Sequence, residues 1–309
     1  MALPGVFPKV AGDVLGSADF NAIQSNVSTV LGTGSGDAGY GQTGAAGYGT
    51  YLSTATRSLG NTVLASDLQN LKSDLDRVSQ HQTGSATALN SISSSSVFTI
   101  GDFNLYNTSA STLYTNRLTA HSTALSVGAG VAPTFSSWNN TRTHEVSVAF
   151  ASADAARYFF NAGGYVQIQP SISYGAYDST KDGRWKSIFE QQVGLIRFKA
   201  RSSERTGSVS PSVFQSTWGY YQNITYGSAS WATLLFAADS APYSANDYTV
   251  NVKINAAGTV LNFQIIFDDG TVGPVDEVVT TTTSSVISYY SNAYGITTPA
   301  PVISNVVAP

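Results

Sequence analysis

Apolar residues follow a helical spacing in three short segments near the start of the chain. Within each segment they recur at offsets of 0, 3, 7 and 10, which places them on one stripe of an amphipathic helix. The stripes are Phe20, Ile23, Val27 and Val30; Leu68, Leu71, Leu75 and Val78; and Phe103, Tyr106, Ala110 and Leu113. A single stripe cannot be buried alone. We therefore predict three short helices that pack on each other or on symmetry mates, as a docking and oligomerisation element.

Each predicted helix opens with the same short motif, which we call the repeated phrase: an apolar residue or two, a small residue, and then an acid, an apolar residue and an amide. The copies are Asp19-Phe20-Asn21, Asp67-Leu68-Gln69 and Asp102-Phe103-Asn104. An acid in the first turn interacts favourably with the helix dipole, and Ser66 with Gln69 fits a capping box for the second helix. The predicted helices run from about residue 17 to 32, from residue 66 to about 80, and from residue 102 towards 121.

The glycine-rich segment after the first helix contains a match to GxGxxG at residues 34–39. A dinucleotide-binding motif follows a strand and opens a helix. This segment follows a predicted helix and opens none, so we interpret it as an extended loop.

From about residue 132 the pattern changes to the alternation of β-strands. Strands are predicted at residues 144–150, 165–174, 196–200, 231–237, 248–255, 259–267 and 275–282, with helices at 153–162 and around 185–193. The predicted fold class is α+β, with a helical docking region at residues 1–125 and a mostly antiparallel β-sandwich or jelly roll at 126–309. The proline-rich end, residues 297–309, is predicted to be an extended arm on a neighbouring subunit.

The composition indicates a folded chain with few charges. Of the 309 residues, 42% are apolar, 11% are charged and none is cysteine, so a core can form without disulfides. The net charge of −4 makes nucleic acid an unexpected partner, because nucleic-acid binding depends on clustered Lys and Arg side chains. The start of the chain lacks a basic leader and contains Pro4 and Pro8. We therefore expect no signal peptide. No run of 18 apolar residues occurs, so we also expect no membrane insertion.

Residues suited to catalysis are few. The three histidines are His81, His121 and His144, and their spacing is not that of metal ligands. We interpret His81 as a cation at a helix C-terminus. The paired acids Asp268-Asp269 and Asp276-Glu277 fall in or near predicted hairpin turns, where acids are commonly solvated. We expect no catalytic residue, no cofactor and no metal ion, and we classify the chain as a non-enzyme.

Aromatic residues are the remaining surface chemistry. Five of them gather within 14 residues, namely Trp218, Tyr220, Tyr221, Tyr226 and Trp231. Rigid rings beside amides and hydroxyls suit a glycan-binding or partner-contacting surface. The competing interpretation places most of these rings in the core of the sandwich.

Several sequence segments resemble segments of virion structural proteins of tailed phages, particularly phages that infect cyanobacteria. They lie at residues 3–9, 17–24 and 30–42, in the second helix with its ending at residues 81–84, and at residues 150–164. The resemblance covers residues 1–85 and 144–164. It implies a structural part of a virion and leaves the position in the particle open.

These observations lead to one expected function and two alternatives. The expected function is a fibre or appendage subunit that attaches to tail, neck or capsid through its N-terminal region. The alternatives are a capsid decoration protein and a receptor-binding or glycan-degrading spike that uses Glu190 or Asp268. The expected partners are other virion proteins, further copies of the chain and a host surface glycan, and the expected location is the virion. Analogy with fibres favours a homotrimer.

Overall fold

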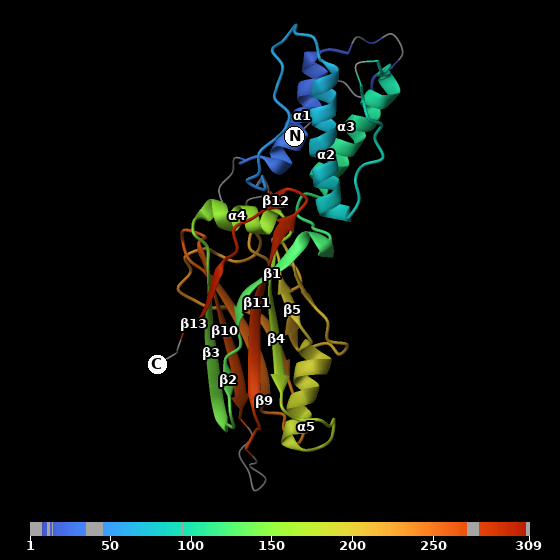
Figure 1. Ribbon diagram of the computed structural model, residues 1–309. Helices are drawn as coiled ribbons and strands as arrows, with labels where there is room; N and C mark the ends of the chain where they lie inside the picture. The colour runs from blue at the N-terminus through green and yellow to red at the C-terminus, as the bar shows by residue number, and fades with distance from the viewer. Residues whose placement is uncertain are drawn as a thin grey trace.

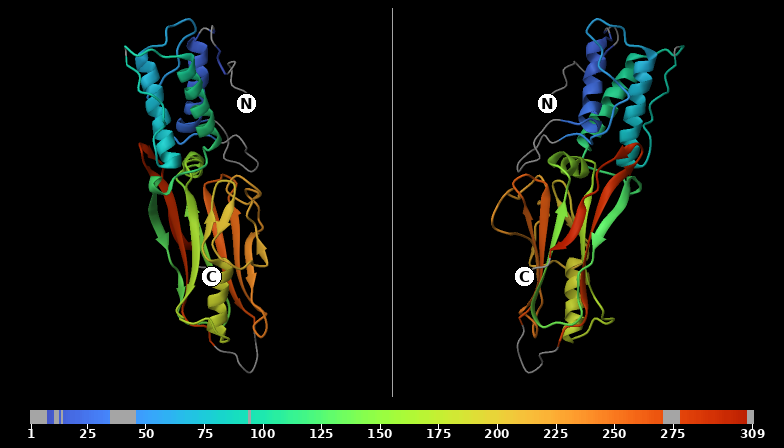
Figure 2. Two further views of the ribbon diagram at one scale, coloured as in Figure 1. Left: turned by 90° about the vertical axis from the view of Figure 1, so that its right-hand side faces the viewer. Right: turned by 60° about the vertical axis from the view of Figure 1, so that its left-hand side comes forward.

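A three-helix bundle stands on one end of a β-sandwich in the computed structural model (Figures 1 and 2). The structure describes residues 8–10, 13, 15–34, 46–93, 95–270 and 278–306. The bundle contains α1 (Ser17–Leu31), α2 (Ala65–Thr83) and α3 (Ile100–Thr115). The predicted α+β class with a sheet-rich second part is confirmed.

The three helices run in the same direction. Their first turns lie at the free end of the bundle and their last turns lie against the sandwich (Figure 2). The side chains of the three stripes face one another and form one core. Those predicted as docking contacts are all at most 7% exposed: Phe20, Ile23, Val27, Val30, Leu68, Leu71, Leu75, Val78, Phe103, Tyr106 and Leu113. Of the two arrangements expected from the sequence, packing on each other or on symmetry mates, the structure shows the first: the stripes are buried against each other inside a single chain.

The sandwich consists of two antiparallel sheets. The first has the strand order β1–β11–β4–β5–β6, with β2 and β12 also paired to β11, and the second has the order β13–β3–β10–β9–β8–β7. The strands are β1 (Leu125–Val131), β2 (Thr134–Phe135), β3 (Asn140–Ala149), β4 (Tyr165–Ile172), β5 (Ile196–Phe198), β6 (Ser203–Arg205), β7 (Val213–Phe214), β8 (Ala232–Ala238), β9 (Asn246–Ile254), β10 (Val260–Asp269), β11 (Thr282–Ala293), β12 (Ile296–Thr297) and β13 (Val302–Val306). A short 3-10 turn, η1 (Ser122–Ala124), precedes β1.

Alternating side chains of the second sheet supply much of the sandwich core. On β10, every second residue from Leu261 to Phe267 is fully buried. A helical segment inserts further aromatic rings between the sheets. It consists of α5 (Lys181–Lys186) and the π-helical turn η2 (Ser187–Val193), and it buries Trp185 and Phe189. The helix expected around residues 185–193 is therefore present.

Strand β11 is the strand whose position differs most from the one predicted from the sequence. The predicted strand at residues 275–282 ends where β11 begins at Thr282, and residues 275–277 lie outside the described residues. The inward positions of β11 include Thr282, Ser284 and Ser288, all fully buried. Small hydroxyl side chains leave room for the aromatic rings of the opposite sheet. They also remove the apolar alternation by which a strand is recognised.

The proline-rich end is not an arm on a neighbour within the described residues. Val302–Val306 forms β13, which pairs with β3 of the same chain in a continuous antiparallel register from Val302↔Ala149 to Val306↔Glu145. Ile303 is only 8% exposed and joins the sandwich core. Residues 307–309 lie outside the described residues.

Helix α4 (Ala153–Asn161) joins the two parts of the molecule. It lies between the last turns of the bundle and the end of the sandwich (Figure 1). Arg157 of α4 is almost fully buried, and its guanidinium donates hydrogen bonds to the backbone oxygens of Thr33, at 2.8 Å, and Ala46. From the bundle, Nε2 of His81 lies 3.1 Å from the backbone oxygen of Ala162.

His81 is fully buried at this junction. Burial lowers its pKa to about 4, despite the opposing effect of the contact with the Ala162 carbonyl. The imidazole is therefore neutral at pH 7, and the expectation of a helix-terminal cation is wrong. Burial also lowers the pKa of His144 to about 4, and that ring stacks on Phe135 with centroids 3.9 Å apart.

We predict that the free energy of unfolding falls as the pH is lowered from about 6.5 towards 4. In that window the unfolded chain binds protons at histidine and the folded chain does not. The contribution of His81 between pH 7 and pH 5 is about 2 kcal/mol. Urea unfolding at both pH values measures the loss, which His81→Gln should reduce by this amount. An unchanged pH dependence in that variant would contradict a neutral, buried His81.

Candidate docking site at the free end of the helical bundle

The acid of each repeated phrase caps its own helix. Asp19, Asp67 and Asp102 accept hydrogen bonds from the backbone N–H groups three positions earlier, over 3.2, 2.8 and 2.9 Å respectively. These caps satisfy donors that the helix itself leaves free. For α2 the capping residue is Leu64, so the capping box expected from Ser66 and Gln69 is wrong. The acid, one residue after Ser66, takes that role.

Two of these acids pair with a cation of the same chain, and the third is stabilised by hydrogen bonds. Lys9 Nζ lies 2.7 Å from Asp19 Oδ1, and Arg57 forms an ion pair with Asp67. Burial raises the pKa of Asp67, but hydrogen bonds from Arg57 and from the Leu64 N–H outweigh it and hold that pKa below its usual value. Hydrogen bonds from the Thr99 side chain and N–H lower the pKa of Asp102.

The amide of each repeated phrase binds backbone rather than a side chain. Asn21 Nδ2 donates to the Arg57 carbonyl over 2.7 Å and Asn21 Oδ1 accepts from the Arg57 N–H over 2.8 Å. Asn104 makes the same pair of bonds with Lys9, over 2.9 and 2.8 Å. Gln69 Nε2 donates to the Ile92 carbonyl. We call these contacts the amide clamps, and the segments that they hold, at residues 9, 57 and 92, the straps.

The amide clamps close a ring. We define a unit as one strap together with the helix that follows it in the chain. In each unit the strap residue lies ten positions before the acid, as in the pairs Lys9 and Asp19, Arg57 and Asp67, and Ile92 and Asp102. The first helix holds the second strap, the second helix holds the third strap, and the third helix holds the first. The bundle is thus an approximate threefold arrangement of three strap-and-helix units within one chain.

The free end of this ring is apolar. Leu15, Val63 and Phe98 each lie four positions before an acid, are partly buried and pack on the bundle core. Next to them in sequence, Leu64 is 50% exposed and Val97 is 86% exposed, and Leu59 on the second strap is 80% exposed. Large apolar side chains that remain in water at one place mark a surface for another molecule.

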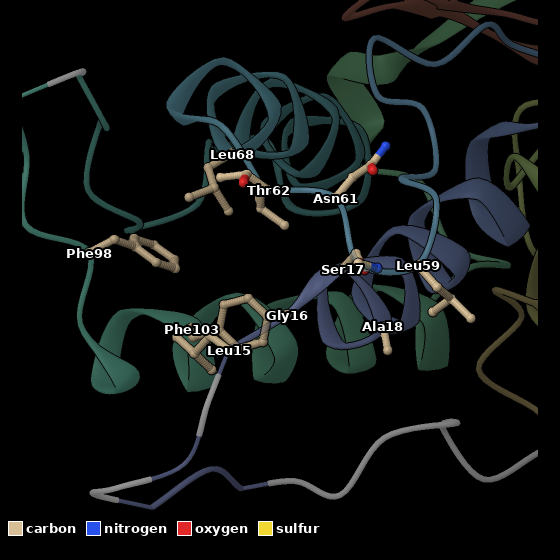
Figure 3. Close-up of a pocket in the computed structure, with 12 residues that line it drawn as sticks. Leu15, Gly16, Ser17, Ala18, Leu59, Asn61, Thr62, Leu68, Phe98 and Phe103 are labelled. Carbon is tan, nitrogen blue, oxygen red and sulfur yellow. The ribbon is translucent and has the colours of Figure 1, made fainter.

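An open depression of about 610 Å³ lies among these residues. Figure 3 shows Leu15, Leu68, Phe98 and Phe103 around it, with Asn61 and Thr62 on the second strap beside it. Its lining comes from all three units, so its shape depends on the closed ring. The depression is lined mostly by apolar groups, and the nearby acids already accept hydrogen bonds from their own helix starts, so the surface can bind an uncharged apolar partner.

The five predicted aromatic contacts do not form one exposed face. They are Trp218, Tyr220, Tyr221, Tyr226 and Trp231. Tyr220 and Tyr221 are at most 2% exposed, and the Tyr221 hydroxyl lies 3.1 Å from Asn161 Oδ1 at the junction. The other three are partly buried, and the ammonium of Lys253 lies 4.9 Å from the centroid of the Trp231 ring. For Tyr220 and Tyr221 the core interpretation is correct.

The acids considered for a glycan-degrading site have separate partners. Asp268 accepts a hydrogen bond from the Thr141 hydroxyl over 2.8 Å, whereas Asp269 is buried and lies 2.9 Å from Lys181 Nζ. Consecutive residues on a strand point to opposite faces, so these two carboxylates do not face each other. Glu190 contacts Lys186 at 2.6 Å and the Tyr177 hydroxyl. Asp276 and Glu277 lie outside the described residues, as do residues 35–39 of the GxGxxG match.

Within the described ranges, no group of three or more histidine or acidic side chains is placed to hold a metal ion. No helix in the same ranges is long and apolar enough to cross a membrane. Comparison with known proteins finds no match to the chain among family models, curated proteins or solved structures.

Sequence reasoning noted apolar residues before each acid but assigned no docking role to the residues of the free end. The apolar positions at residues 15, 63 and 98 repeat with the acids, so the same internal comparison that reveals the phrase could have singled them out. The contacts of the amides could not be predicted in this way. An Asn or Gln in a predicted helix does not show which backbone segment its side chain binds.

We predict that Asn104→Ala lowers the free energy of unfolding by about 2 kcal/mol, because two hydrogen bonds to the first strap are lost. Chemical denaturation of the full chain measures the difference. Asn107→Ala is the matched control on the same helix, since its Oδ1 has no hydrogen-bond partner among the described residues. Equal effects of the two substitutions would contradict the amide clamp.

Proposed function

We propose that the chain is a structural component of a tailed-phage virion, a fibre or appendage subunit that attaches through the free end of its helical bundle. The observation that carries the proposal is the open depression at that end, lined by Leu15, Leu59, Leu68 and Phe98. Leu59, Leu64 and Val97, which precede the starts of the helices or lie on the second strap, are exposed by 50–86%. The resemblance of residues 1–85 and 144–164 to virion proteins supports the same class.

The attachment surface differs from the one expected from the sequence. The stripes are buried, so docking uses the ends of the helices and not their sides. Burial of a large apolar side chain stabilises an interface by roughly 1.5–3 kcal/mol. Burial of Leu59, Leu64 and Val97 would therefore offset part of the entropic cost of association, and the remaining contacts of the depression would have to supply the rest.

The arrangement of the two parts favours an appendage over a decoration protein. The docking surface lies at one end of the long axis, and the sandwich extends away from it (Figure 1). A subunit held at this end projects from the particle, whereas a decoration protein is expected to lie flat on the lattice. The separate partners of Glu190, Asp268 and Asp269 give no support to a glycan-degrading spike.

We predict that Leu59→Asp and Val97→Asp each reduce co-sedimentation of the subunit with virions by about tenfold, because each places a charge in an apolar contact. Both side chains are more than three-quarters exposed, so the fold is retained. Leu64→Asp tests the same surface and supplies a favourable N-cap to α2. Circular dichroism and the urea midpoint report on folding.

Val209→Asp is the matched control, because Val209 is 49% exposed and lies in the sandwich. It should co-sediment like the unchanged chain. Full incorporation of the Leu59→Asp and Val97→Asp variants would refute attachment through the free end. Gold labelling of the subunit on particles would then show whether the sandwich lies flat on the capsid instead.

A further inference from the structure

The edges of the two sheets are unequally protected against pairing with another strand. Natural sheets blunt their edges with very short strands, charges, prolines or bulges. Strand β7 has only two residues, β6 has three and carries Glu204 and Arg205, and β1 has a register shift between Val127 and Gly130. Each of these three edges has at least one protective feature.

Strand β13 has none of these features within its own five residues, and Pro301 directly precedes it. It is an outer strand of the second sheet and pairs with β3 in an unbroken register. Its five residues, Val302 to Val306, include no charge and no proline. Val302 and Val306 are 69% and 42% exposed. With Ser304 between them they lie on the same face, because alternate residues of a strand share a face.

We infer that β13 pairs with β13 of a second copy of this chain, antiparallel about a twofold axis at Ser304. In this register Ser304 lies opposite Ser304 of the second copy, and each Val302 lies opposite a Val306. The exposed valines thereby cover each other on one face of the sheet. An antiparallel pair of identical strands is self-complementary and forms a closed dimer. Because β13 carries no charge, the two paired strands do not place like charges opposite each other.

This inference is independent of attachment to a virion. It concerns the opposite part of the chain from the helical bundle and needs no partner besides the protein itself. The two second sheets would join into one continuous sheet, with the backbone groups of the outer β13 edge hydrogen-bonded to the second copy instead of water.

A single-cysteine experiment on the full chain tests the register, because the chain contains no cysteine. Directly opposed residues in an antiparallel pair have Cα atoms about 4.5–5.5 Å apart, within the range of a disulfide, about 4.4–6.8 Å. Ser304→Cys should therefore form a disulfide-linked dimer under mild oxidation. In Val302→Cys the two cysteines are offset by four residues, about 13 Å, and no crosslink should form.

The double variant Val302→Cys/Val306→Cys restores opposed cysteines and should crosslink again. Val209→Cys, on an exposed site in the sandwich away from β13, measures random collision. Crosslinking of Ser304→Cys no faster than Val209→Cys, or equal crosslinking of Ser304→Cys and Val302→Cys, would overturn the proposed pairing.

Sedimentation velocity over a concentration series gives a second readout. The unchanged chain should shift with concentration from 32.4 kDa to twice that mass, and Val302→Lys/Val306→Lys should abolish the shift while Val209→Lys preserves it. A chain that stays at the single-chain mass at every concentration contradicts the dimer. A dimer that persists in the double lysine variant places the interface elsewhere and also refutes the proposal.

Discussion

Parallel helices within one chain impose a constraint on everything that connects them. A chain that leaves the last turn of one helix must return along the full length of the bundle before it can begin the next. Such return segments have few backbone partners of their own, and an unpaired backbone group that is shielded from water is costly. The amide clamps resolve this constraint, because Asn21, Gln69 and Asn104 bind the backbone of the straps at equivalent places.

The same constraint orients the bundle on the sandwich. Parallel helices present all their last turns to one side, and in this chain that side is occupied by α4, Arg157 and the buried, neutral His81. The first turns are consequently left together at the other end, where each is capped by its own acid. An apolar free end therefore follows from the topology of the bundle and from the residues that precede each cap.

The sequence predicts the parts of this fold that are periodic. The three stripes, the helix at α4 and most strands of the second sheet appear where the spacing of apolar residues places them. Strand β11 was not predictable in this way, since Ser284 and Ser288 occupy core positions where apolar residues are expected. The spacing of apolar residues also does not show which surface a buried stripe packs against. Phe20 and Leu71 have the same spacing whether they face another subunit or another helix of their own chain.

Because the threefold arrangement of helices lies within one chain, a trimer is not needed to bury the three stripes. A fibre trimer buries three equivalent helices from three chains, whereas here one chain supplies all three and the stripes need no second copy. Association through β13 would be twofold instead, and the strands run along the long axis of the molecule (Figure 1). Antiparallel pairing reverses that axis, so the two bundles would point in opposite directions. A dimer of this kind would present one apolar free end at each end of its long axis.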